Sequence, residues 1–156
     1  MENFQQVVAD RTHRAGVEFV FNVRRIPEDK ATWRPMDEGE SPLGMAIHVI
    51  DATGRWKRSI GSGIFQTPDQ SVVGKLIQEI ETLEQAATRL EHDHAALVET
   101  IRNFPSARLD DPFSAPWRTA PMSEWLMHPF FHLSYHQGQL AYIQTLIGDH
   151  EMARPK

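Results

Sequence analysis

The sequence contains no cysteine among its 156 residues. This absence excludes disulfide bonds, cysteine nucleophiles and thiolate ligands to a metal ion. Any bound metal ion must therefore be held by histidine, carboxylate or backbone groups. The chain has eight histidines, so imidazole ligands are plentiful.

Long apolar runs and basic clusters are missing as well. No window approaches the roughly 18 consecutive apolar residues that a membrane-spanning helix requires. The start of the chain, residues 1–4, lacks the basic segment and apolar stretch of an export signal. The 16 Lys and Arg residues are dispersed and are outnumbered by 21 Asp and Glu. We therefore predict a cytoplasmic protein with no membrane and no nucleic-acid partner.

What is present is the composition of an ordinary globular protein, with 40% hydrophobic and 24% charged residues. A chain of this length builds one domain around one hydrophobic core. We predict a single domain over residues 1–150 and a short C-terminal tail over residues 151–156.

Apolar residues recur at spacings of three and four along most of the chain, which is typical of amphipathic helices. Alternating, β-branched segments of the kind found in strands are lacking. The pattern predicts four helices, over residues 2–25, 41–60, 70–103 and 123–148. We therefore expect an all-α fold, a four-helix bundle with up-down character.

Local signals define the ends of these predicted helices. Ile26-Pro27 ends the first, because the residue before a proline is pushed out of the helical region. Ser41-Pro42 starts the second, with serine as the N-cap and proline at the first helical position. Gly148 ends the last helix. Before that helix, a proline-rich connection with no buried strand or helix is predicted from Pro105, Pro112, Pro116 and Pro121.

Two histidines stand out by their spacing. His132 and His136 are four residues apart, so on a helix they share one face and can bind one ion from the same side. The spacing alone is a weak indication. Both lie in an apolar stretch, residues 130–136, which indicates that they are buried. Burying two imidazoles without a partner is energetically costly, and a bound metal ion would remove that cost.

A third ligand would have to come from a facing helix. His48 is one possibility, since it lies in the most apolar stretch of the second predicted helix. On spacing alone, however, such a histidine is more often a hydrogen-bonded core residue. His128 precedes His132 by four residues, but it sits at the helix start next to Pro129, so we expect it to form a wall of the pocket.

The other four histidines have polar neighbours or lie near a terminus, and we expect them to be solvated and chemically ordinary. They are His13, His92, His94 and His150.

The chain resembles the DinB-like superfamily of metal-dependent four-helix-bundle proteins over nearly its whole length. The resemblance is carried by Ile26-Pro27, Trp33-Arg34-Pro35, Ser41-Pro42-Leu43 ahead of His48, and above all His132-Leu-Ser-Tyr-His136-Gln-Gly138-Gln139-Leu140. It implies a DinB-like bundle in which His48, His132 and His136 hold one divalent ion, usually nickel, zinc, manganese or iron. With three protein ligands, one coordination position is expected to be open.

The resemblance also suggests what such a centre does. DinB-like proteins include transferases that use low-molecular-weight thiols, a thiol-dependent isomerase and metal-dependent hydrolases. We therefore predict a metal-dependent enzyme with a small-molecule substrate, and place thiol transfer ahead of hydrolysis. The alternative is a non-catalytic metal- or ligand-binding stress-response protein. A homodimer is expected by the same resemblance.

No catalytic side chain is assigned from the sequence. Asp51, Arg55 and Tyr135 are close enough to the histidines to be considered for acid–base work. A structural role is favoured for each of them: Asp51 and Arg55 as an exposed ion pair, and Tyr135 as a core aromatic residue with its hydroxyl at the surface. Gly138 is expected to permit close approach of another helix or subunit, and Gln139 to hydrogen-bond a metal ligand. Packing is an equal alternative for both residues.

Overall fold

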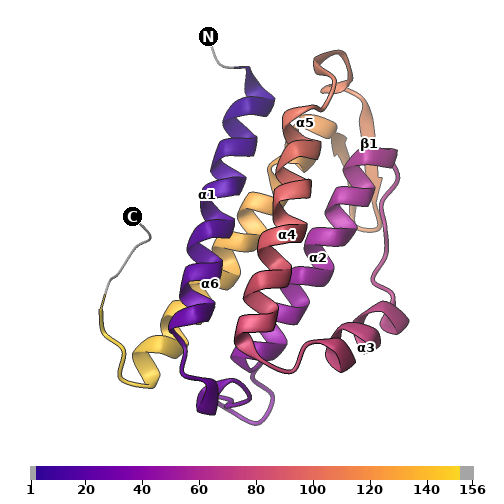
Figure 1. Ribbon diagram of the computed structural model, residues 1–156. Coiled ribbons are helices and arrows are strands. Elements are labelled where there is room, and N and C mark those ends of the chain that lie inside the picture. The colour runs from indigo at the N-terminus through magenta and orange to yellow at the C-terminus, as the bar shows by residue number, and fades with distance from the viewer. Residues whose placement is uncertain (1–2, 152–156) are drawn as a thin grey trace.

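The computed structural model describes residues 3–151, and they form a bundle of four long helices with a small hairpin at one end (Figure 1). The predicted tail at residues 151–156 lies outside the described residues beyond Glu151. The helices are α1 (Phe4–Arg25), α2 (Pro42–Ser62), α3 (Gln70–Glu79), α4 (Leu83–Arg102), α5 (Met122–Leu126) and α6 (His128–Leu146), with single 3₁₀ turns at Glu28–Lys30 and Ser106–Arg108 and strands β1 (Pro112–Ala115) and β2 (Arg118–Pro121).

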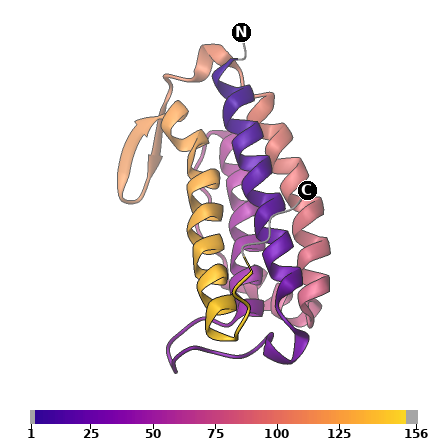
Figure 2. The same cartoon turned by 90° about the vertical axis from the view of Figure 1, so that its left-hand side faces the viewer.

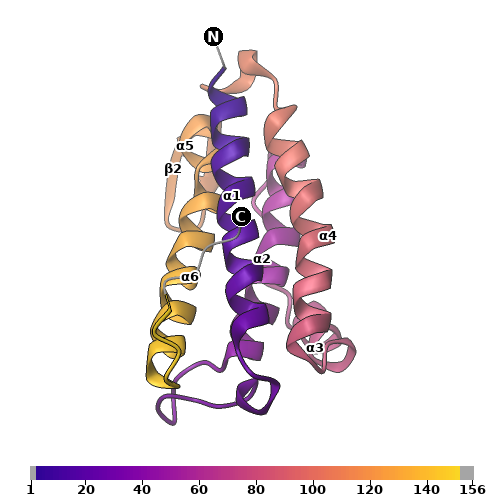
Figure 3. The same cartoon turned by 60° about the vertical axis from the view of Figure 1, so that its left-hand side comes forward.

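The four long helices α1, α2, α4 and α6 lie side by side (Figures 2 and 3). Helices α1 and α2 each pack against both α4 and α6. The predicted all-α bundle is therefore confirmed. Its order is not a simple up-down series, because residues 63–82 lead the chain back along the bundle, and α2 and α4 run in the same direction (Figure 1).

The ends of α1 and α2 follow from local chemistry. The Asn3 side chain accepts a hydrogen bond from the Gln6 backbone N–H, and Ser41 accepts one from the Gly44 N–H. Each bond satisfies a donor that the first helical turn leaves free. Gly63 ends α2 with a φ of 74°, a left-handed conformation that favours glycine.

The single helix predicted over residues 70–103 is wrong, since the structure has two helices there. Thr82 forms a capping box with Gln85 and starts α4. Ile80, just before it, has an extended backbone and is buried. The apolar spacing continues from α3 into α4 because both helices face the same core. The capping box at Thr82 marks the boundary between them.

The proline-rich connection between residues 105 and 121 contains a short hairpin that the sequence pattern does not predict, although most of its strand residues are exposed as expected. Strands β1 and β2 pair antiparallel, with Pro112 opposite Pro121. The prolines occupy the ends of a two-stranded ribbon, where a missing N–H is tolerated. The last predicted helix is likewise divided, into α5 and α6 on either side of Met127.

The interior contains two clusters of buried side chains. The first core cluster lies between the long helices and includes Phe19, Ile50, Leu90 and Leu133. The second core cluster, at the hairpin end, includes Trp56, Ile101, Phe113 and Trp125.

His94 was predicted to be solvated, but it is buried, with 4% of its surface exposed. Its ring lies against Gly16 of α1, and a Cβ atom added there would overlap the ring. Its sequence neighbours are polar, yet its helical neighbours Leu90 and Leu97 are both buried. The residues at i−4 and i+3 therefore indicate the environment of a helical side chain better than those beside it in sequence.

Replacing Gly16 by alanine tests this packing. We expect Gly16→Ala to lower the free energy of unfolding by about 1–3 kcal/mol, because the new methyl group must displace the His94 ring. Denaturant unfolding measures the change. In a His94→Ala background the same substitution should cost much less.

Gly138→Ala is the matched control, since nothing in the described chain lies within 4 Å of a Cβ atom at that helical position. It should leave stability unchanged or raise it slightly through better helix propensity. An equal cost for Gly16→Ala with and without His94 would contradict the proposed overlap.

Candidate metal centre

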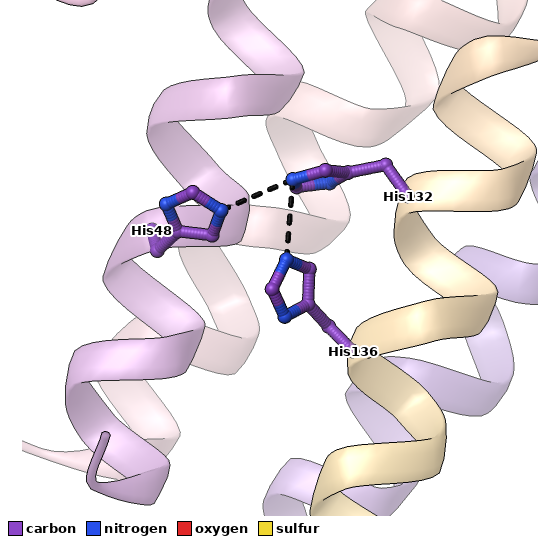
Figure 4. A group of neighbouring side chains, drawn as sticks. All are labelled: His48, His132 and His136. Carbon is purple, nitrogen blue, oxygen red and sulfur yellow. Dashed lines mark hydrogen bonds between the residues drawn. The ribbon is translucent and has the colours of Figure 1, made fainter. Parts of the chain in front are cut away.

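Three histidines converge between helices α2 and α6. His48 projects from α2, and His132 and His136 project from α6 one turn apart (Figure 4). The Nε2 atom of His132 lies 3.0 Å from Nε2 of His48 and 3.2 Å from Nε2 of His136. One ring nitrogen of each lies within 4.8 Å of the other two. The structure therefore brings together the three residues that the sequence singled out.

The three side chains lie at the edge of the first core cluster. His48 is exposed although Ile47 and Val49 beside it are buried, and the other two histidines are partly buried. His48 is therefore not a core residue. A cavity of about 550 Å³ opens next to it, lined by α2, α3 and the segment before α2. Its size is in the range of small-molecule sites.

All three imidazoles are held in the neutral form. Burial, followed by the neighbouring His136 and His48, lowers the pKa of His132 to about 3. Partial removal of the rings from water is also the main cause that lowers the pKa values of His136 and of His48, although His48 keeps an exposed edge. Neutral imidazole is the form that binds metal ions.

Gln139 orients the His136 ring. Its Oε1 atom accepts a hydrogen bond from Nδ1 of His136 at 2.7 Å, and its Nε2 atom lies 3.4 Å from the Tyr135 hydroxyl. With the proton on Nδ1, the Nε2 atom of neutral His136 presents a lone pair to the other two rings. This contact is the one expected of Gln139.

The three rings do not satisfy one another by hydrogen bonds alone. Because Nε2 of His136 has no proton, His132 must donate its own Nε2 proton to it. His132 then has neither a second proton nor a lone pair at Nε2 for His48. Three lone pairs directed at one divalent ion would resolve the conflict, and ligand nitrogens around tetrahedral zinc lie about 3.3 Å apart. The residues present therefore fit a metal ion.

His128 lies outside this group. Its ring centroid is 4.5 Å from that of Trp56 and 5.7 Å from that of Trp125, in the aromatic part of the second core cluster. Its Nδ1 atom is buried and has no hydrogen-bond partner among the described residues.

Two expectations about neighbouring residues are wrong. The Asp51–Arg55 ion pair is not exposed, since only 5% and 11% of the two side chains reach solvent. Tyr135 is not a core residue, being 65% exposed. Within residues 3–151 no other helix approaches Gly138 closely, and its contact with another subunit stays a prediction. The apolar residues around Asp51 in the sequence indicate that it is buried. The i, i+4 spacing of Asp51 and Arg55 alone suggests an exposed pair instead.

The fold and the histidine cluster together define a helical bundle with a candidate metal centre between two of its long helices. A family profile described as the DinB superfamily matches residues 11–140, so the chain belongs to the DinB superfamily. A search of curated protein sequences gives no match.

Two solved proteins have similar structures. A DinB-like protein, YjoA from Bacillus subtilis, is 15% identical with a TM-score of 0.72, and the match covers 96% of both chains. A mycothiol-dependent maleylpyruvate isomerase is 16% identical with a TM-score of 0.67, and its H-to-A mutant is 14% identical with a TM-score of 0.64. Both isomerase matches cover 90% of this chain and 63% of the isomerase. These similarities concern the fold. No helix within residues 3–151 has the length and apolar content needed to cross a membrane.

The lowered pKa of His132 predicts how the stability of the metal-free protein depends on pH. Below its ordinary value of 6.5, the unfolded chain takes up a proton that folded His132, with a pKa of about 3, does not. The contribution of neutral His132 to the free energy of unfolding is therefore fully present above pH 6.5 and decreases as the pH falls below it. His132→Gln should flatten this dependence between pH 6.5 and about 3, as measured by thermal unfolding in chelator.

His92→Gln is the control, because His92 is 85% exposed on α4. It should retain the wild-type pH dependence. Parallel curves for wild type and His132→Gln would show that His132 is not held neutral by the fold.

Proposed function

We propose that His48, His132 and His136 bind one divalent metal ion and that the protein is a metal-dependent enzyme. The observation that carries the proposal is the convergence of three Nε2 atoms that cannot satisfy one another by hydrogen bonding. The neutral state of the rings and the orientation of His136 by Gln139 support it. Membership of the DinB superfamily supports it independently.

An all-imidazole donor set suits nickel, zinc, iron or manganese in different degrees, with zinc and nickel favoured by nitrogen ligands. Among residues 3–151 no fourth His, Asp or Glu joins the group, which leaves a coordination position for substrate. An ion held there would supply a Lewis acid able to bind a thiol sulfur as thiolate or to polarise a carbonyl group. The exposed edge at His48 and the adjacent cavity give a small molecule access.

We further propose that the substrate is a low-molecular-weight thiol, with the protein acting as a thiol-dependent transferase. The absence of cysteine from the chain is compatible with this, because a transferase that uses a soluble thiol needs no cysteine of its own. The similarity in fold to a mycothiol-dependent isomerase supports this choice over hydrolysis. A purely structural metal site is the competing function, and it would have a closed shell of protein ligands.

The metal assignment predicts the metal content of purified protein. Wild type should contain about one divalent ion per chain, whereas His48→Ala, His132→Ala and His136→Ala should each contain less than about a tenth of that, because two imidazoles bind weakly. Elemental analysis after purification without added metal measures the content.

His92→Ala is the matched control, since it removes an exposed histidine of α4 and should leave the content unchanged. Full occupancy in the three single variants would remove the basis of the assignment.

The substrate assignment predicts a metal-dependent response to thiols. L-cysteine at saturating concentration should raise the melting temperature of the metal-loaded protein by about 3 °C or more, through preferential binding to the folded state. S-methyl-L-cysteine has no free thiol and should give a much smaller shift. The same shift in chelator-treated protein would mean that the thiol binds elsewhere.

A further inference from the structure

Arg55 is placed to reach the histidine centre from within the same helix. It lies seven residues, nearly two full turns, after His48 on α2, so both side chains leave the same side of the helix. Helical side chains lean toward the N-terminus of their helix. The Arg55 side chain follows this direction, because its Nε atom donates to Oδ2 of Asp51, one turn earlier, at 2.7 Å. The guanidinium group is thereby carried toward His48.

The Asp51–Arg55 pair is almost entirely withdrawn from solvent, with 5% and 11% of the two side chains exposed. Withdrawing two charges costs desolvation energy, and a buried pair is favourable only when its remaining donors are also satisfied. Asp51 pairs with the Nε group alone. Neither Nη group of Arg55 has an acceptor among residues 3–151, and neither is sealed from solvent.

Two planar Nη groups without a protein acceptor form the fork that binds a carboxylate in bidentate fashion. Arg55 lies close enough to the centre to act on it, since its charge contributes to the lowered pKa values of His48 and His132. Asp51 and Glu40 act in the opposite direction on the pKa of His48. A carboxylate would satisfy the free Nη donors that Asp51 leaves unpaired.

We propose that Arg55 binds the carboxylate group of the substrate, and that Asp51 holds the guanidinium group in position to do so. This inference rests on the proposed metal and thiol function, and it makes the substrate a small thiol that carries a carboxylate. Arg55 is then a specificity-determining residue that touches substrate. A role of the pair in packing alone would give no preference for an anion.

A pair of probes separates carboxylate binding from sulfur binding. 3-Mercaptopropionate and 3-mercapto-1-propanol have the same carbon chain and the same thiol, and differ in the carboxylate. Nickel-loaded, full-length wild type should bind the acid at least about tenfold more tightly than the alcohol in calorimetric titration, as expected for a charge-assisted hydrogen bond. Arg55→Met should abolish the preference and change the affinity for the alcohol by less than about threefold.

Further variants guard against a general loss of structure. Asp51→Asn/Arg55→Met avoids a buried unpaired carboxylate and should behave as Arg55→Met does. Arg55→Lys keeps the charge without the fork and should retain only part of the preference. Arg25→Met is the matched control, since Arg25 also pairs with an aspartate, Asp149, and is 18% exposed. It should retain the full preference.

Nickel content, measured on the same samples, tells the two proposals apart. A wild type that binds nickel but does not prefer the acid would overturn the role of Arg55 and leave the metal centre standing. The same holds if nickel-loaded Arg55→Met, or the double variant, keeps the wild-type preference. A wild type that binds no nickel, zinc, iron or manganese would overturn the metal centre and the role of Arg55 with it.

Discussion

The convergence of three neutral imidazoles between α2 and α6 is the constraint on which the rest of the site depends. Polar groups at a helix–helix contact must find partners, and His132 has two ring neighbours competing for one nitrogen. Gln139 makes the conflict sharper, because it fixes the proton of His136 on the outer nitrogen. A bundle that arranges its polar groups in this way is less stable without a ligand than with one.

The charged groups around the three histidines also affect which ligands the centre can bind. No carboxylate belongs to the three-histidine group within the described residues, so a divalent ion would keep its full charge there. Asp51 is nearby, but its charge is already paired with Arg55. A divalent ion bound there would be the main positive charge of the centre and would favour thiolates and carboxylates over neutral ligands. Under the proposed function, the ion and Arg55 would then recognise two groups of the same substrate.

The sequence predicts the parts of this structure that depend on local spacing. Apolar periodicity gives the four long helices, and the i, i+4 relation places His132 and His136 on one face. His48 is different, because it lies 84 residues from His132 and no local pattern relates them. Family resemblance was needed to choose it. Composition and periodicity do not predict three features. The break before α4 depends on the cap at Thr82, and the hairpin depends on strand pairing. The burial of His94 depends on its contact with another helix.

The structural relatives share the fold of this chain at low sequence identity. At 15% identity YjoA still matches over 96% of the chain, so widely different sequences build the same bundle. Chemistry in such a fold depends on the few polar residues that face its interior. Here these lie on long helices, where rigid backbone holds the imidazoles in register. The segment before α2 supplies Arg34 and Glu40 to the cavity beside His48, and a connecting segment of this kind tolerates more sequence variation than the helices it joins.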